Sequence, residues 1–305
     1  MTITSYERYL AEELENFQEI AKALKPSSGH VPSLHGIDIC GASIPLNGVI
    51  GGDHTIYLDF AKRFDMKRRI REATAAGQTE VAANLIKGTH RAGILLADVA
   101  GHRVTDALIA AMLHQAFLLG VYYELDRFGE ITTKLFEHIN QRFFTSTNIN
   151  RYLTMIYGEI SDEGRFRFIS AGHPPPMVFS REFSCFVHIS EKLMTTYPPV
   201  GIFASHAEPD EEVDPGSLGY KQRYTVNTID LLSPGDVLLL YTDGLSEHGG
   251  GTFFPNAVER VIAEVVDEPA RKICSHLKRS VLDYAEPHDD VSFVAIKKTY
   301  LSQAR

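Results

Sequence analysis

Hydrophobic residues near the N-terminus recur every three or four positions, which is the spacing of one helix face. The apolar positions are Leu10, Leu14, Phe17, Ala21 and Leu24, with glutamate and lysine among the residues between them. This pattern predicts a helix over residues 5–24, which the Pro-Ser-Ser-Gly sequence at 26–29 would end. The spacing is also that of a coiled coil, although the run is too short to form one unaided. A helix packed on its own domain and a dimer seam therefore both remain open.

The rest of the chain separates into strand-rich and helix-rich stretches. The predicted strands lie at 36–59, 92–100, in several short runs between 152 and 244, and in the sequence DDVSFVAIK near the C-terminus. The predicted helices lie at about 105–123, 131–144 and 256–284, with one or two exposed helices in the alanine- and arginine-rich stretch 65–87. Strands in two groups with helices between them indicate an α+β or layered sandwich fold rather than a regular βαβ alternation.

Charge and hydropathy argue against two classes of partner. The 305 residues carry a formal net charge of −9 and contain no basic stripe with interleaved aromatic residues. Nucleic acid is therefore not an expected partner. The longest apolar stretch, 107–123, contains His114 and Gln115 and is short for a membrane span. We expect it to be a buried helix, with no membrane association.

The cysteines and the N-terminus indicate a cytoplasmic protein. Cys40, Cys185 and Cys274 are far apart in the sequence and form no metal-binding pair. Sparse cysteines of this kind are typical of a reducing compartment. The first residues, MTITSYERYLAEELENF, are polar and lack the apolar segment of a secretory signal.

Aspartates occur at four places where a buried strand meets a glycine-containing or tight turn. They are Asp53 in GGD, Asp98 in ADVAGH, Asp243 in YTDG, and Asp289 with Asp290 in HDDV. Each alone is typical of a turn, but carboxylates that converge repel one another unless a cation lies between them. Oxygen ligands without a His–Cys cluster favour Mg²⁺ or Mn²⁺. Two such ions would suit the hydrolysis of a phosphate ester.

Taken in order, these motifs resemble those of the SpoIIE/RsbU-like branch of the metal-dependent protein phosphatases (PPM family, related to type 2C). The resemblance runs from about Phe17 to Lys297 through GIDICGASIP, GGD, ADVAGH, YGEI, AGHPPP, LLSPGDVLLLYTDGLSE and DDVSF. It implies an α+β fold, a four-layer αββα sandwich, over residues 30–300. Residues 1–25 would form a separate N-terminal helix, and about 61–91 a helical insertion.

The resemblance also implies a ligand set for two divalent cations, Mn²⁺ or Mg²⁺. The implied ligands, which would act in catalysis through a metal-activated water, are Asp53, Asp98, the backbone carbonyl of Val99, Asp243 and Asp289. Asp290 would hold its neighbour in place. The remaining motif residues with candidate supporting roles are Gly52, Gly101, His102, Arg103 and Gly244.

Several positions depart from the family pattern or have two interpretations. The sequence GGDHTIYLDF places Asp59 later than the aspartate of the family pattern GGDxxDF, which leaves its role open. Arg103 stands where glycine is common and would contact a phosphate or simply be solvated. His102 would either transfer a proton or orient its loop. His173 lies in AGHPPP, whose three prolines favour a structural turn over a catalytic role for this histidine. We expect the 61–91 insertion near the metal-site end, as tolerated loop growth or as a lid or docking surface.

The resemblance implies a metal-dependent serine/threonine phosphatase that acts on a phosphorylated regulatory protein of the anti-sigma-factor-antagonist type. Two alternatives remain: a catalytically impaired binding module with the same fold, and a phosphatase of small phosphomonoesters. A homodimer through the N-terminal helix is a further expectation.

Overall fold

Two five-stranded antiparallel sheets pack face to face in the computed structural model, which describes residues 5–23, 31–46, 51–101, 106–146, 152–205, 215–230 and 233–300. The first sheet has the order β1 (Ile37–Ile44), β10 (Val291–Lys298), β9 (Val237–Tyr241), β6 (Met177–Ser180) and β7 (Cys185–Val187). The second has the order β2 (His54–Asp59), β3 (Arg91–Val99), β4 (Leu153–Ser161), β5 (Arg165–Ala171) and β8 (Asn227–Asp230). We call them the β1 sheet and the β2 sheet.

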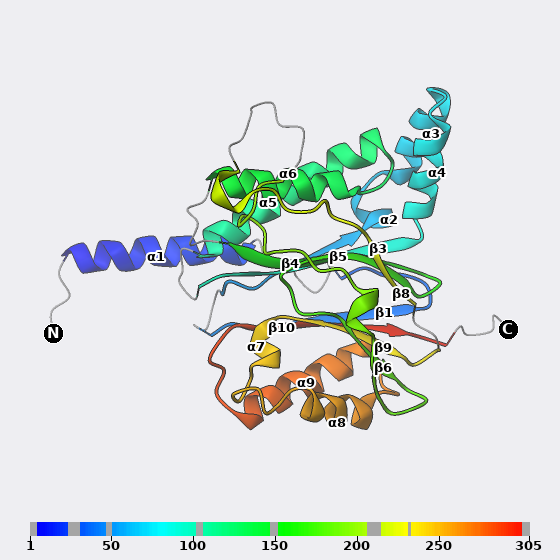
Figure 1. Ribbon diagram of the computed structural model, residues 1–305. Helices are drawn as coiled ribbons and strands as arrows, with labels where there is room; N and C mark the ends of the chain where they lie inside the picture. Colours follow the sequence, from blue (N-terminus) through cyan, green and yellow to red (C-terminus); the bar gives the residue numbers. More distant parts are fainter. Residues whose placement is uncertain are drawn as a thin grey trace.

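Helices cover the outer face of each sheet, which gives the four layers seen in Figure 1. The β2 sheet carries α2 (Phe60–Arg63), α3 (Met66–Ala75), α4 (Thr79–Gly88), α5 (Asp106–Arg127) and α6 (Thr133–Ser146). The β1 sheet carries α7 (Asp243–Ser246), α8 (Asn256–Val265) and α9 (Ala270–Tyr284), and two short 3₁₀ turns, η2 (Glu191–Leu193) and η3 (Gly216–Leu218), lie in loops. The predicted αββα sandwich is therefore confirmed.

The alternation of side chains along each strand accounts for the layers. In β1, Ile37 and Ile39 pack between the two sheets, while Cys40 and Ala42 face the cluster that contains α8 and α9. Successive side chains of a strand point to opposite faces, so a strand between two layers must be apolar on both. The unbroken apolar run of β3 meets this requirement and is almost wholly buried.

The insertion at 61–91 is helical, as expected, but its predicted position near the metal-site end is wrong. His54 pairs with Ala97 and Asp59 pairs with Ala92, so β2 and β3 form a hairpin whose connection leaves at the end away from Asp53. Five residues of strand separate the two ends by about 17 Å. Figure 1 shows α3 and α4 at the right, opposite the end at which α7 begins. This position excludes a lid over the aspartates.

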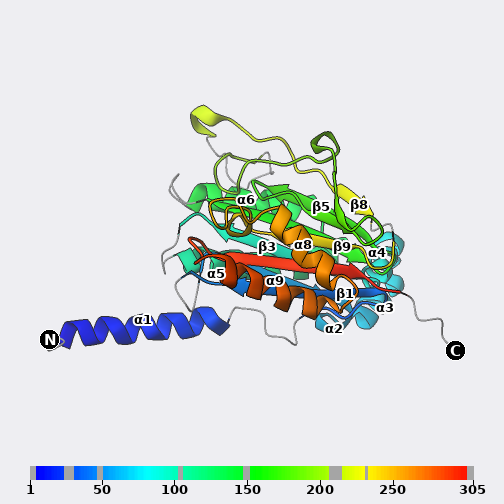
Figure 2. The ribbon, with the colours of Figure 1, turned by 90° about the horizontal axis from the view of Figure 1, so that it is seen from below.

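The N-terminal helix α1 (Ser5–Ala23) projects from the body in both views (Figures 1 and 2). It meets the body at α5, and Tyr6, Leu10, Leu14 and Ile20 along it are exposed to solvent. The interpretation that the apolar stripe packs on its own domain is therefore wrong for Leu10 and Leu14.

Among the described helices, α5 alone is long and apolar enough to span a membrane by length and composition. Leu113, Phe117 and Val121 on one face are completely buried in the core with β3 and α6, as predicted for this stretch. The opposite face was not predicted to be exposed, yet Leu108 and Leu119 are 51% and 60% accessible.

Candidate metal centre

The four sequence-predicted aspartates come together at one end of the two sheets. Asp53 precedes β2 and Asp98 lies near the end of β3, and these strands are paired. Asp243 follows β9 and Asp289 precedes β10, and Tyr241 pairs with Phe293 to bring the two ends together. Antiparallel pairing therefore places two carboxylates at the same end of each sheet.

The carboxylates are close enough to change one another's ionisation. Burial raises the pKa of Asp53 well above its usual value, and the nearby charge of Asp98 raises it further. Burial also raises the pKa of Asp98 to about 8, together with the charges of Asp243 and Asp289. A hydrogen bond with the Asp243 carboxyl group also raises the pKa of Asp98. Such a group is unfavourable as four anions and becomes favourable when a cation is bound.

Two carboxylate oxygens in this group fit a cation because they have no hydrogen-bond partner. Oδ1 of Asp53 and Oδ1 of Asp243 are both buried and accept no hydrogen bond from the described residues. An unsatisfied buried acceptor costs about 1–3 kcal/mol, and more when it is charged. No three His, Cys, Asp or Glu side chains within the described ranges are grouped closely enough to hold an ion by themselves.

Glycine lets the backbone approach these carboxylates closely. A Cβ atom on Gly52 would lie 2.9 Å from the carbonyl oxygen of Val99 and 3.6 Å from Oδ1 of Asp98. Any larger residue at 52 would thus crowd the candidate carbonyl ligand. Gly101 has a φ of +122°, a conformation that favours glycine, and a Cβ there would lie 2.7 Å from Oδ2 of Asp106.

Asp290 has both carboxylate oxygens engaged by backbone amides. Oδ1 accepts a hydrogen bond from the Leu46 amide at 2.7 Å, and Oδ2 accepts one from the Gly52 amide at 2.6 Å. A Cβ on Gly51 would collide with this carboxylate, and one on Gly244 would collide with the Asp290 carbonyl. Asp290 therefore holds the backbone at Leu46 and Gly52, next to Asp53, in place.

Thr242 and Ser292 contact Asp53 and were not identified from the sequence. The hydroxyl of Thr242 donates to Oδ2 of Asp53 at 2.9 Å, and hydrogen bonds from Ser292 and Thr242 oppose the rise in the pKa of Asp53. The only signal in the sequence was a hydroxyl residue between a buried strand and Asp243. That signal does not specify a contact across the two sheets.

The other candidates lie elsewhere or have other roles. Asp59 is at the far end of β2, where it accepts hydrogen bonds from the amides of Lys62 and Ser33 at 3.1 Å and caps α2. It therefore does not reach the other aspartates. His173 is buried, and burial lowers its pKa to about 3, so its ring is neutral. Its Nδ1 atom lies 2.9 Å from the Thr154 hydroxyl oxygen. His102 and Arg103 lie outside the described residues.

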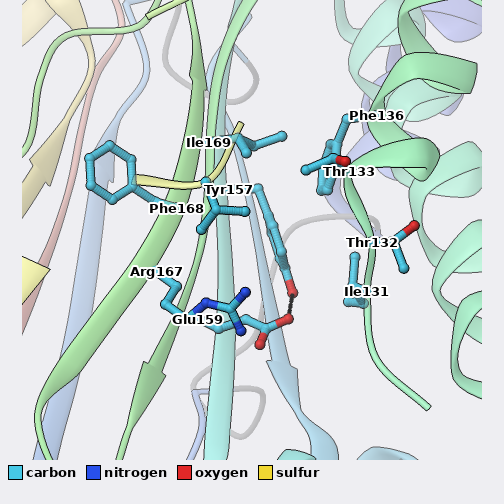
Figure 3. Close-up of a pocket in the computed structure, with 10 residues that line it drawn as sticks. Ile131, Thr132, Thr133, Phe136, Tyr157, Glu159, Arg167, Phe168 and Ile169 are labelled. Carbon is cyan, nitrogen blue, oxygen red and sulfur yellow. Dashed lines mark hydrogen bonds between the residues drawn. The ribbon is translucent and has the colours of Figure 1, made fainter. Parts of the chain in front are cut away.

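A small cavity of about 30 Å³ lies away from the aspartates, between β4, β5 and the start of α6 (Figure 3). It is lined by Tyr157, Glu159 and Arg167 among others, and the Tyr157 hydroxyl donates to Glu159 at 3.0 Å. Glu159 is five residues along β4 from Thr154, the partner of Asp98, so the cavity is at the opposite end of the strand. Its volume suits a single water molecule.

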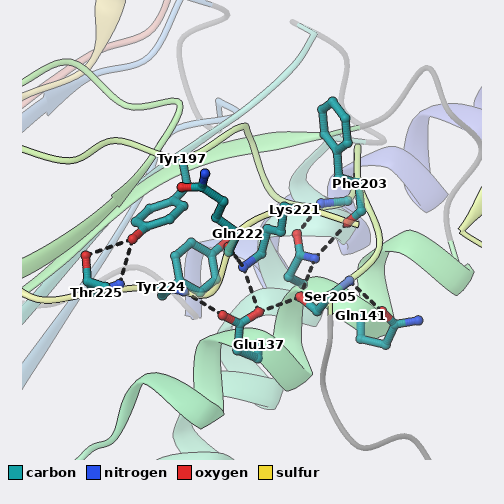
Figure 4. Close-up of polar contacts among 11 residues, drawn as sticks. Glu137, Gln141, Tyr197, Phe203, Ser205, Lys221, Gln222, Tyr224 and Thr225 are labelled. Carbon is teal, nitrogen blue, oxygen red and sulfur yellow. Dashed lines mark hydrogen bonds and ion pairs between the residues drawn. The ribbon is translucent and has the colours of Figure 1, made fainter. Parts of the chain in front are cut away.

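A buried ion pair fixes the long connection between β7 and β8 to α6 (Figure 4). Lys221 donates to Oε2 of Glu137 at 2.6 Å and lies 3.4 Å from the centre of the Tyr224 ring. The same carboxylate accepts hydrogen bonds from the Ser205 hydroxyl and the Tyr224 amide. All the acceptors of this carboxylate are satisfied within the protein, so the cluster is structural.

Known proteins that are similar to this chain agree with the family that its motifs resemble. The family model described as Stage II sporulation protein E (SpoIIE) matches residues 88–299. The chain is 28% identical over 211 residues to the phosphoserine phosphatase RsbP of Bacillus subtilis (strain 168), which covers 68% of this chain and 46% of RsbP. The chain thus spans about half the length of this curated relative.

Two solved structures show the same fold. The SiaA-PP2C domain of Pseudomonas aeruginosa matches with a TM-score of 0.64 and 13% identity, over 96% of this chain and 98% of that chain. The catalytic domain of the serine/threonine protein phosphatase PstP, in complex with two manganese ions, matches with a TM-score of 0.51 and 12% identity, over 87% of this chain and 100% of that one. The fold is therefore that of the PP2C phosphatase domains.

Proposed function

Because the chain belongs to the SpoIIE family, whose model matches more than half of it, we propose that it is a metal-dependent phosphatase acting on phosphoserine or phosphothreonine of a partner protein. The observation that carries this proposal is the group of converging aspartates with two buried oxygens that lack a donor. Divalent cations held by carboxylates are well suited to phosphate-ester hydrolysis. The names of RsbP and PstP describe phosphatases, which supports the same activity.

The proposed cofactors are two divalent cations, Mn²⁺ or Mg²⁺. Their proposed ligands are Asp53, Asp98, the Val99 carbonyl, Asp243 and Asp289. Asp98 interacts electrostatically with Asp53, Asp243 and Asp289, so it is the carboxylate best placed to be shared. When bound, such cations lower the pKa of a water molecule and neutralise charge on the phosphate.

The contribution of the protein is to hold these groups in place before substrate arrives. Asp53 and Asp98 extend from the β2 sheet, and Asp243 and Asp289 extend from the β1 sheet. Asp290 fixes the backbone at Leu46 and at Gly52, because it accepts one amide hydrogen bond from each. Water is the proposed nucleophile, so no phosphorylated enzyme intermediate is expected.

The direct test is hydrolysis of p-nitrophenyl phosphate over a range of Mn²⁺ and Mg²⁺ concentrations. We expect activity that requires the metal and falls at least about 100-fold in Asp98→Asn, because that change removes a shared charge. Asp59→Asn is the matched control, since Asp59 belongs to the same hairpin but lies at its far end. Full activity in Asp98→Asn would overturn the ligand assignment. Metal binding without turnover of any phosphate ester would instead favour the impaired binding module.

The proposed substrate is a phosphorylated regulatory protein of the anti-sigma-factor-antagonist type. This proposal rests on the resemblance of the whole motif series and on the family match. The test compares kcat/KM for a phosphoserine-bearing domain of that type with kcat/KM for small phosphomonoesters. A higher value for the small esters would identify a small-molecule phosphatase.

We also propose that α1 forms a homodimer contact. Tyr6, Leu10 and Leu14 are exposed on α1, and Leu108 and Leu119 are exposed on α5, which α1 meets. A second copy of the chain would bury these side chains. Light scattering should give a dimer for residues 1–305 and a monomer after deletion of residues 1–24. A monomer in both cases would refute the contact.

The proposed location is the cytoplasm, consistent with three free cysteines at 40, 185 and 274.

A further inference from the structure

We propose that Thr242 is a positioning residue for the metal centre, because its hydroxyl fixes Asp53 so that one carboxylate oxygen remains directed at the cation. This inference rests on the proposed function, since it concerns the same site. It gives a role to Thr242, which stands in the YTDG motif but is assigned none by the ligand set, and its main test measures metal binding rather than activity.

The Thr242 hydroxyl has two acceptors within reach, and Oδ2 of Asp53 is the closer of them. The side chain is completely buried directly after β9. Its oxygen accepts a hydrogen bond from the Ser292 amide at 3.0 Å and lies 2.9 Å from Oδ2 of Asp53 and 3.3 Å from the Ser292 carbonyl. That carbonyl already accepts the Thr242 amide at 2.9 Å. The hydroxyl therefore donates its single proton to the closer acceptor, the Asp53 carboxylate, and this hydrogen bond is strongest when Asp53 is ionised beside a cation.

The same hydrogen bond explains why the two oxygens of Asp53 differ. Oδ2 is held by Thr242, whereas Oδ1 is buried and has no donor among the described residues. A carboxylate with one oxygen held cannot rotate freely, so the direction of the other oxygen is determined. Oriented ligands bind metal ions more tightly than mobile ones, because the cost of ordering has already been met.

Thr242 also connects the two halves of the site. Asp53 belongs to the β2 sheet, and Thr242 lies at the end of β9 in the β1 sheet, directly before Asp243. The hydrogen bond thus fixes a ligand from one sheet relative to a ligand from the other. A purely structural threonine would satisfy its own hydroxyl and stabilise the strand end, without any effect on affinity for metal in the folded protein.

The experiment measures Mn²⁺ affinity by calorimetry in Thr242→Val, Thr242→Ser and a control. Valine keeps the volume and removes the donor, whereas serine keeps the hydroxyl. Ser180→Ala is the control, because Ser180 is a buried hydroxyl residue (6% exposed) in the same sheet, on β6 near the opposite end of β9. We expect Thr242→Val to weaken Mn²⁺ binding about 10- to 100-fold, and Thr242→Ser and Ser180→Ala to change it less than about threefold.

The kinetic constants kcat and KM distinguish a positioning role of Thr242 from a role in substrate binding. At saturating Mn²⁺, Thr242→Val should lower kcat for p-nitrophenyl phosphate while KM changes little, because Thr242 acts through Asp53 and does not touch the substrate. Wild-type protein that binds Mn²⁺ but hydrolyses nothing would remove the proposed function and leave the calorimetric prediction testable.

Two results would overturn the proposal. One is wild-type Mn²⁺ affinity in folded Thr242→Val, and the other is equal weakening in Thr242→Ser. If circular dichroism shows that the valine variant does not fold, Thr242→Cys is measured in its place. A thiol is similar in size to the hydroxyl but is only a weak hydrogen-bond donor. Weakened Mn²⁺ binding in the folded cysteine variant would support the positioning role, and unchanged affinity would refute it.

Discussion

Replacing Asp290 with alanine should destabilise the metal-free protein considerably, because two backbone donors would lose their acceptor. Asp290 is 3% exposed, and its carboxylate accepts the amides of Leu46 and Gly52 at 2.7 and 2.6 Å. Hydrogen bonds to a charged group contribute about 1.5–3 kcal/mol each, so their combined loss costs about 3–6 kcal/mol. Removing a negative charge near Asp53 and Asp98 offsets part of this cost. We therefore expect a net loss of about 2–4 kcal/mol.

The measurement is urea unfolding in EDTA, which separates folding from metal binding. Asp290→Asn is the matched variant, because its amide oxygen can keep one of the two acceptor contacts. We expect it to lose about half as much stability as Asp290→Ala. An alanine variant with the wild-type urea midpoint and an unchanged m-value would show that the two hydrogen bonds contribute nothing, and the supporting role of Asp290 would then be wrong.

Three further predictions concern other parts of the structure. Gly244→Ala should weaken Mn²⁺ binding, measured by calorimetry, because a Cβ there would collide with the Asp290 carbonyl; unchanged affinity would show that the backbone adapts freely. For His173, the folded pKa of about 3 lies below an unfolded value of about 6.5, so its contribution to stability is complete above pH 6.5. That contribution to the free energy of unfolding should fall by about 1.4 kcal/mol per pH unit on acidification towards pH 3. In urea unfolding at several pH values, His173→Gln should reduce the slope of the free energy of unfolding against pH by this amount. An identical slope in the wild type and the variant would refute the lowered pKa of His173. Lys221→Met should lower the free energy of unfolding by about 3–5 kcal/mol, because it leaves Glu137 buried and unpaired. Adding Glu137→Leu should restore much of this stability. A double variant as unstable as Lys221→Met would contradict the pairing argument.

The layers of the fold could be predicted from local patterns because each strand and helix has its own periodicity. The continuous apolar run of β3 predicted a strand with both faces covered, and the structure has helices on one side and a sheet on the other. The four aspartates could be found because each stands at a strand end beside a tight turn. Their convergence follows from antiparallel pairing, which the order of motifs indicated through the family resemblance.

Long-range geometry could not be predicted from the same patterns. The position of the insertion was wrong because periodicity identifies helices at 65–87 but not the end of the hairpin from which they leave. The sequence left the role of Asp59 open, and the register of β2 places it about 17 Å from Asp53. The contact of Thr242 with Asp53 joins residues 189 positions apart in different sheets. Only the packing of the two sheets determines that contact.

The most direct test of the central claim is a crystal structure of the protein soaked in Mn²⁺, with the ions located by anomalous scattering. We expect ion density between the carboxylates of Asp53, Asp98, Asp243 and Asp289, with Oδ1 of Asp53 and Oδ1 of Asp243 among the ligands. Full-occupancy Mn²⁺ sites elsewhere, with these two oxygens still unligated, would contradict it.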